Sequence, residues 1–531
     1  MRYFNKFLKF ATLPTILLLN LPQTNALNLN LSPLTSGPIV NGVDNNGDAN
    51  ESLNKVPLWG RAGDKHHKDY YLVARLKTGD ADFEPPKFTK VDSLNDKTGI
   101  IPFPELQINT PYEYQIGYIK TKKDAGLADL SGEIIHIKNW DRASTGKFHT
   151  PNPNAEQLSF VFGSCYRYTS VLHFELGASG KRGSRIFRSI SEQLKNDPAN
   201  GFFLRIGDNV YFDPIGKISF GQSKTLDDMR ETYRTVWGFP NYRNLLANTI
   251  TYSQKDDHDS GFNNAIPLEE ICDAEIVAHA EKSFFEYQKW DGPNGSQKLY
   301  YSFSRGTAEF FVFDTREERV NRTKNNEGID QIPHMINPEQ FKAFQDWIQN
   351  PAIQNKVKFV VTTVPLISTA DADAWAGFPA QQRQIVETIL GNDRDGTPIT
   401  KAFILTGDGH CTHGGTYNIN NEAGQIGTLT EIMSSGLKSI VSFGSKDDFP
   451  AAIDIRDKGG LHFVKIDESD VFPDTSKADG IIGKIGNLIC ENVDGVFVRM
   501  DINLPENILT MNTFNQNNVL LGSKTYPIVA Q

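Results

Sequence analysis

Four short polar clusters constrain the fold of this chain more than any other feature. They are Gly163-Ser164-Cys165, Gly207-Asp208-Asn209-Val210-Tyr211, Asp256-Asp257-His258-Asp259 and Gly407-Asp408-Gly409-His410. Three of them follow apolar runs of strand-like composition, at 158–162, 202–206 and 402–405, with glycine where the strand should stop. Residues just past the carboxyl ends of strands in an open α/β sheet converge on one crevice, so we expect the clusters to share one site.

The side chains in these clusters are of the types that bind metal ions. Thiolate and imidazole suit transition metals, and carboxylates suit harder cations such as calcium. Each residue also has a structural reading: Cys165 taken alone is a buried small hydrophobic residue, and Tyr211 is an aromatic residue packed at a strand end. The presence of four such clusters along the chain favours a shared metal site over a separate packing role for each residue.

The length of 531 residues is too great for one simple core and predicts two domains. Short runs at 71–76, 87–91, 112–119 and 133–137, separated by turn residues, predict an N-terminal immunoglobulin- or fibronectin-like β-sandwich over 27–148. The polar segment 139–157 contains two prolines and predicts a linker. A catalytic domain is expected over 149–531.

The second domain alternates predicted strands with predicted helices. Apolar residues recur at helical spacing in 184–195 and 379–390. Asn337 followed by Pro338 predicts the start of another helix, and 359–361 is the core of a short strand. This alternation indicates a layered α/β domain.

The first 26 residues predict a secretory signal peptide. Basic residues precede an apolar stretch over about 10–21, and Thr24-Asn25-Ala26 is a plausible cleavage region. An uncleaved N-terminal anchor is the alternative. No later segment has the roughly 20 continuous apolar residues of a spanning helix, so we expect a secreted or periplasmic protein with no transmembrane segment.

Charge and cysteine content exclude other classes. The 54 Lys and Arg against 64 Asp and Glu leave a net charge of −10, and no basic run mixed with aromatic residues is present, so no nucleic-acid surface is expected. The expected oligomeric state is a monomer. If Cys165 binds metal, Cys272, Cys411 and Cys490 permit at most one disulfide.

Seven stretches, in order, resemble the PhoD-type alkaline phosphatases, a branch of the calcineurin-like metallophosphoesterases. They are the first two clusters, Asp256 to Asn263, Phe313-Asp314-Thr315-Arg316, Trp375 to Pro379 with Arg383 following, the Gly407 cluster and Met433-Ser434-Ser435-Gly436. The resemblance covers about 155–470. It implies an αββα sandwich, in which two packed mixed sheets are flanked by helices, and a centre that holds ferric iron and calcium, although other divalent metals are possible.

The resemblance also implies a set of metal ligands. They are Cys165, Asp208, Tyr211, Asp257, Asp408 and His410. The thiolate of Cys165 and the phenolate of Tyr211 suit ferric iron, and Asp208 is expected to bridge two metals. Oxygen ligands near Asp257 favour calcium.

The implied reaction is attack of a metal-activated hydroxide on phosphorus. The charge that spreads over the phosphoryl oxygens needs fixed positive partners, and we expect Arg316 to supply it, with Arg234 a weaker choice. His258 is expected to protonate the leaving oxygen or bind the phosphoryl group. The alternatives are a surface pair of Arg316 with Glu317 or Glu318 and a core role for His258.

Two departures from the family pattern are visible. Lys255 stands where the pattern has tryptophan, which puts the local packing or the substrate wall in question. Arg2 has no arginine neighbour, so the twin-arginine export signal frequent in the family is missing.

The sequence therefore predicts a secreted metal-dependent phosphoesterase acting on a phosphate-ester substrate, either a monoester or a diester. A phospholipase D-like or nucleotide diesterase is the alternative among enzymes. A non-catalytic exported metal-containing binding module is the alternative outside them.

Overall fold

The computed structural model describes fifteen segments of the chain. They are 27–28, 37–38, 55–63, 69–121, 137–171, 174–177, 184–197, 199–213, 223–268, 272–288, 298–321, 332–369, 373–438, 450–471 and 495–529. The predicted signal peptide and Cys490 lie outside these segments.

Two mixed β-sheets occupy the middle of the molecule. The first has the order β14-β13-β10-β23-β24-β25. Its strands are β14 (Ile250–Gln254), β13 (Phe202–Ile206), β10 (Gln157–Tyr166), β23 (Val496–Asn503), β24 (Ile508–Asn515) and β25 (Leu520–Pro527). Strands β14, β13 and β10 run parallel, and the last three are antiparallel to their neighbours.

The second sheet has the order β15-β16-β17-β18-β20-β19-β22-β21. Its strands are β15 (Tyr301–Arg305), β16 (Ala308–Val312), β17 (Val357–Val361), β18 (Ala402–Thr406), β20 (Gly424–Lys438), β19 (Thr412–Asn421), β22 (His462–Val471) and β21 (Ala452–Asp454). The two sheets join where β10 and β20 pair in parallel, at Ser164 with Ser435 and at Tyr166 with Lys438.

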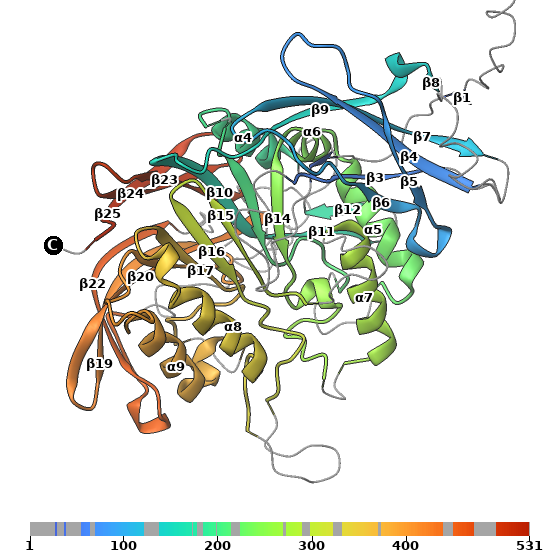
Figure 1. Ribbon diagram of the computed structural model, residues 1–531. Helices are drawn as coiled ribbons and strands as arrows, with labels where there is room; N and C mark the ends of the chain where they lie inside the picture. The colour runs from blue at the N-terminus through green and yellow to red at the C-terminus, as the bar shows by residue number, and fades with distance from the viewer. Residues whose placement is uncertain are drawn as a thin grey trace, which may run out of the picture.

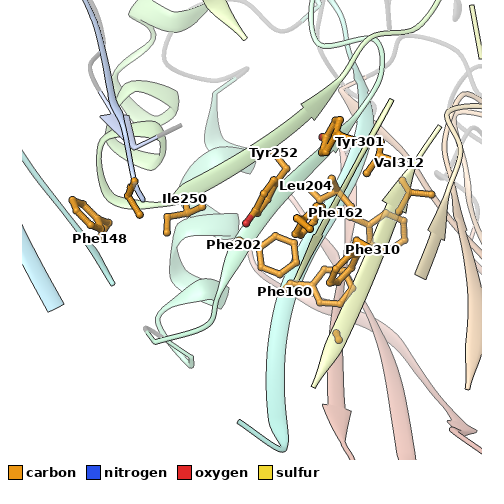
Figure 2. Close-up of a cluster of buried hydrophobic side chains, with 14 of the residues drawn as sticks. Phe148, Phe160, Phe162, Phe202, Leu204, Ile250, Tyr252, Tyr301, Phe310 and Val312 are labelled. Atoms are coloured by element: carbon orange, nitrogen blue, oxygen red, sulfur yellow. The ribbon is translucent and has the colours of Figure 1, made fainter. Parts of the chain in front are cut away.

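A strand with apolar residues on both faces needs cover on both sides, and these strands have it. On β10, Phe160 and Phe162 point into the layer between the sheets, whereas Val161 points to the outer layer. Figure 2 shows the inner layer, where Phe160 meets Phe310 of the other sheet edge to face at 5.3 Å and stacks on Phe202 at 5.0 Å. This aromatic packing fixes the sheets against each other.

Helices cover the outer face of each sheet (Figure 1). Those on the first sheet are α4 (Arg185–Leu194), α5 (Leu226–Gly238), α6 (Pro240–Asn248) and α7 (Ala274–Tyr287), and those on the second are α8 (Pro338–Ile348) and α9 (Pro379–Ile389). Helix α8 begins as predicted, because the Asn337 side chain accepts a hydrogen bond from the Gln340 N–H at 2.7 Å. The predicted αββα layering is confirmed.

The N-terminal region, blue in Figure 1, is β-rich as predicted. A four-stranded antiparallel sheet has the order β5 (Lys87–Val91), β4 (Asp69–Lys77), β7 (Pro111–Thr121) and β9 (Ser144–His149). A three-stranded sheet contains β2 (Gly37–Pro38), β3 (Leu58–Arg61) and β6 (Thr98–Ile101). Gly60 of β3 lies so close to Leu72 and Ile116 of the other sheet that a Cβ there would meet the Ile116 side chain at 3.1 Å.

The prediction of a linker over 139–157 was wrong in one part. Residues 144–149 form β9, which pairs with β7 from Pro111↔His149 to Ile116↔Ser144. Only Phe148 of this edge strand is buried, and it stacks on Tyr112 at 5.4 Å. One buried aromatic residue among polar ones gives too little alternation to be recognised as a strand.

Two short pairs complete the described strands: β1 (Leu27–Asn28) with β8 (Ile137–Lys138), and β11 (Tyr168–Val171) with β12 (Phe174–Gly177). Within the described segments, no helix is long and apolar enough to cross a membrane.

Candidate metal centre

The four polar clusters lie at the carboxyl ends of neighbouring strands. Cys165 is the second-to-last residue of β10, Asp208 follows β13, Asp257 follows β14, and Asp408 with His410 follows β18. These strands all run in the same direction through the parallel pairs β14-β13-β10-β20-β18. The clusters therefore open on one edge of the joined sheets.

Cys165, Asp208 and His410 form the first ligand group, with potential ligand atoms within 4.8 Å of one another. The Cys165 Sγ lies 3.4 Å from Asp208 Oδ2. Tyr211 joins this group, because its hydroxyl donates to Asp208 Oδ2 at 2.9 Å and lies 3.2 Å from His410 Nε2. A thiol, a phenol, a carboxyl and an imidazole thus meet at one buried point.

Two further ligand groups overlap the first. Asp208, Asp257 and His258 form one, and Asp256, Asp257 and Asp408 form the other, each with ligand atoms within 4.8 Å of one another. Asp208 is shared by the first and second groups and Asp257 by the second and third. The three groups therefore form one continuous cluster rather than three separate sites. We call its four carboxylates, Asp208, Asp256, Asp257 and Asp408, the acidic row.

The backbone at four of the predicted ligands is in the left-handed region. Their φ angles are 62° at Cys165, 53° at Asp208, 66° at Asp408 and 51° at His410. Such conformations cost on the order of 1–3 kcal/mol each in a residue other than glycine. Gly207, at φ 98°, lies close to Asp256, since a Cβ there would meet the Asp256 Cβ at 2.6 Å. These backbone turns direct the ligand side chains that follow different strands toward one site.

Negative charge is disfavoured at Asp208, Asp408 and Cys165, whereas at Asp257 the charges of His258 and Arg316 outweigh burial and lower the pKa. Burial, together with Asp257 and Cys165, raises the pKa of Asp208 well above its ordinary value. Burial, with Asp256 and Asp257, does the same for the pKa of Asp408. Burial and the nearby Asp408 raise the pKa of the Cys165 thiol to about 12. A bound cation would relieve this repulsion, since ligands of this kind lose their protons to metal.

A buried carboxylate oxygen of Asp257 gives independent support for a bound metal ion. The Oδ1 atom of Asp257 is buried and accepts no hydrogen bond within the described part of the chain; Arg316 Nη2 lies 4.0 Å from it. The other oxygen, Oδ2, accepts from the Asn264 backbone N–H at 2.6 Å, which fixes the carboxylate. A buried carboxylate oxygen without a hydrogen bond is expected where a cation binds.

Arg316 contacts Asp256 of this row and is completely buried, so the predicted alternative of a surface pair with Glu317 or Glu318 was wrong. Its Nε donates to Asp256, and its two terminal nitrogens donate to Asp373 at 2.6 and 2.9 Å. Arg234, the weaker choice, pairs with Asp96 at 2.9 Å and with Glu231 at 2.9 Å. Neither of these two carboxylates belongs to the three ligand groups.

His258 forms a pair that the sequence did not indicate. Its Nδ1 lies 2.5 Å from Asp213 Oδ1, and its ring stacks on Tyr211 with a centroid distance of 4.1 Å. Burial opposes the charged form, but Asp257, Asp213 and Asp208 outweigh it and raise the pKa of His258 well above its ordinary value. The neighbouring carboxylates therefore favour the protonated form of His258.

Residues outside the predicted set of site residues hold the loops in place. The buried Asp259 carboxylate accepts backbone N–H bonds from Asn209 at 3.1 Å, Val210 at 3.2 Å and Asp256 at 3.0 Å, tying the loop after β13 to the loop after β14. Lys255 is also wholly buried and pairs with Glu317, so it packs inside the molecule where the family pattern has tryptophan. Asp213 follows Tyr211-Phe212 and Asp373 precedes Ala374-Trp375, and neither has a sequence signal beyond its acidity.

Residues 160–470 match the sequence profile described as PhoD-like phosphatase. The chain belongs to the PhoD-like phosphatase family. Two solved structures are similar to it. A structure of PhoD has 15% sequence identity and a TM-score of 0.58, covering 96% of this chain and 90% of its own. Purple acid phosphatase PPD1 from yellow lupin (Lupinus luteus) seeds has 10% identity and a TM-score of 0.53, covering 93% and 74%.

At these identities the structural likeness shows the shared fold. A search of curated protein sequences found no match. Membership of the PhoD-like family, together with the clustered side chains, makes the chain a metal-dependent phosphoesterase, and so a hydrolase. The resemblance that the sequence motifs indicated is confirmed.

Proposed function

We propose that this PhoD-like chain is an exported phosphoesterase that hydrolyses phosphomonoesters or phosphodiesters at the acidic row. The observation that carries the proposal is the overlap of three ligand groups through Asp208 and Asp257. Shared carboxylates are what a centre with two or more close cations requires, because each carboxylate has two oxygens to offer. The signal-like first 26 residues support export, to the periplasm or outside the cell.

The proposed ligands divide by chemistry. Cys165, Tyr211 and His410, with one oxygen of Asp208, suit a transition metal such as ferric iron. Asp257, which shares one ligand group with Asp208 and another with Asp408, would suit a hard cation such as calcium together with these carboxylates. Bound cations at such a site lower the pKa of water from about 15.7 toward 7 and neutralise phosphoryl oxygens.

Protein groups around the row have distinct proposed roles. His258 gives its proton to the oxygen of the leaving group, which would otherwise depart as an alkoxide. Arg316 has three nitrogens committed to carboxylates, so we propose that it acts by holding Asp256 and, through Asp373, the loop before Trp375. Asp213 keeps the His258 ring oriented and charged.

The hydrolysis of chromogenic aryl and bis-aryl phosphates tests the proposed function. We expect turnover of at least one of the two substrates, loss of turnover with a chelator and recovery on adding metal, since the acidic row works only when loaded. Elemental analysis of the native protein is expected to give iron and calcium. Full turnover by a protein freed of metal would contradict the enzyme proposal, and a loaded protein inactive on every ester would favour a non-catalytic binding module.

Substitution of Asp213 with asparagine is expected to lower kcat by about 10- to 100-fold, the usual cost of removing a group that orients a functional histidine. Because Asp213 helps to raise the pKa of His258, its loss lowers that pKa, and the alkaline limb of the kcat profile moves to lower pH. The measurement is kcat against pH for both proteins. A profile that keeps its alkaline limb in place would show that His258 is not the acid.

A further inference from the structure

Two serine hydroxyls contact the sulfur of Cys165. The Ser435 Oγ donates to Cys165 Sγ at 3.1 Å, and the Ser164 Oγ lies 3.2 Å from the same sulfur. Both serines are fully buried, at 1% exposure or less. A buried sulfur flanked by two hydroxyl groups is unusual for a cysteine that serves only as a small hydrophobic residue, because each hydroxyl must satisfy a hydrogen bond there.

The join between the two sheets places these hydroxyls. Ser164 of β10 is the register partner of Ser435 of β20, one of the two residue pairs at which the sheets meet. Cys165 follows Ser164 directly, so its sulfur lies beside both serines. Gly407 packs against Ser164, since a Cβ at Gly407 would meet the Ser164 Oγ at 2.7 Å. The strand register therefore fixes where the two buried hydroxyl groups lie.

The direction of each hydrogen bond follows from the backbone groups nearby. The Ser435 Oγ accepts the His410 N–H at 2.9 Å, and the Ser164 Oγ accepts the Asp408 N–H at 3.2 Å. A hydroxyl has a single proton, and an oxygen that accepts a backbone N–H keeps that proton for another acceptor. The Cys165 sulfur, when deprotonated, can accept both of these protons, at 3.2 Å from the Ser164 Oγ and 3.1 Å from the Ser435 Oγ.

We propose that Ser164 and Ser435 are positioning residues that tune the bond between the Cys165 thiolate and its metal ion. The inference rests on the proposed function, which makes Cys165 a ligand. Hydrogen bonds to a ligand sulfur withdraw electron density from it, so the sulfur donates less to the metal. The same two hydroxyls hold the backbone of Asp408 and His410, which couples the thiolate to the loop that carries two other ligands.

The test uses protein loaded with cobalt(II), whose thiolate-to-metal charge-transfer band reports the sulfur directly, whichever metal the native protein holds. The variants are Ser164→Ala, Ser435→Ala and the double variant. Ser434→Ala is the matched control, because Ser434 is buried on the same strand but donates to the Phe162 carbonyl at 2.8 Å and accepts from the Val498 N–H at 3.1 Å. Metal content and the melting temperature are measured for each protein.

Each single variant is expected to move the band to longer wavelength, the double variant to move it further, and Ser434→Ala to leave it in place. A band that stays fixed in both single variants would overturn the inference while leaving Cys165 as a ligand. Loss of metal from both single variants, but not from Ser434→Ala, would also overturn it. The hydroxyls would then be required for metal binding itself rather than for adjusting the bond between the sulfur and the metal. A wild-type protein that binds cobalt without any such band would remove Cys165 from the ligand set and overturn the proposed ligands instead.

Discussion

The Asp208→Asn variant is expected to lose hydrolysis by on the order of 10³-fold or more, because Asp208 is shared by two of the three overlapping ligand groups. An amide carries no charge to hold a cation and cannot offer two equivalent oxygens. The change removes both halves of the centre together, so kcat and the bound metal should fall together. The measurements are steady-state turnover of aryl phosphates and elemental analysis of the same preparation.

The fold of this variant is expected to survive. Burial and like charges raise the pKa of Asp208, so the folded protein without metal binds this proton more tightly than the unfolded chain. Its stability therefore falls as pH rises through that pKa, and removal of the charge abolishes this loss. Asp501→Asn serves as the control, since Asp501 pairs with Arg499 on the same sheet, outside the ligand groups. Retained turnover or retained metal in Asp208→Asn would contradict the shared-ligand assignment.

The Arg316→Met variant is expected to lose about 3–5 kcal/mol of the free energy of unfolding, the usual cost of breaking a buried ion pair from one side. Arg316 is 0% exposed, and its removal leaves Asp256 buried next to Asp257 without the Arg316 guanidinium, while Asp373 keeps only Arg319 as a partner. Denaturant unfolding of the protein measures the loss, with the slope of the transition checked for two-state behaviour.

Arg383→Met provides the matched comparison for Arg316. Arg383 bridges Glu387 and Glu422 on the outside of α9 and is 28% exposed, so its loss should cost less than about 1 kcal/mol. Equal effects of the two substitutions would show that Arg316 does not support the acidic row.

The sequence predicts much of the catalytic domain because its strands and helices carry local signals. The apolar run 202–206 coincides with β13, and Asn337 with Pro338 marks the start of α8. The ligand residues could be predicted because each strand end is punctuated by glycine and polar residues with metal-binding side chains. The neighbouring strand β14 was missed, since Ile250-Thr251-Tyr252-Ser253-Gln254 reads as half polar, although all five residues are buried.

Contacts between distant segments could not be predicted from the same signals. Asp213 meets His258 across 45 positions and Arg316 meets Asp373 across 57, and a lone aspartate in a loop carries no mark of its partner. The pairing of Ser164 with Ser435 depends on the register of two strands about 270 residues apart. These long-range contacts are what convert a row of acidic residues into one site.

Anomalous X-ray diffraction from crystals of the native protein, collected on both sides of the iron absorption edge, tests the central claim most directly. We expect a peak specific to iron between Cys165, Asp208, Tyr211 and His410, and a second cation peak at Asp257, which shares one ligand group with Asp208 and another with Asp408. Electron density for these six side chains with no cation among them, in a protein that hydrolyses phosphate esters, would contradict the account.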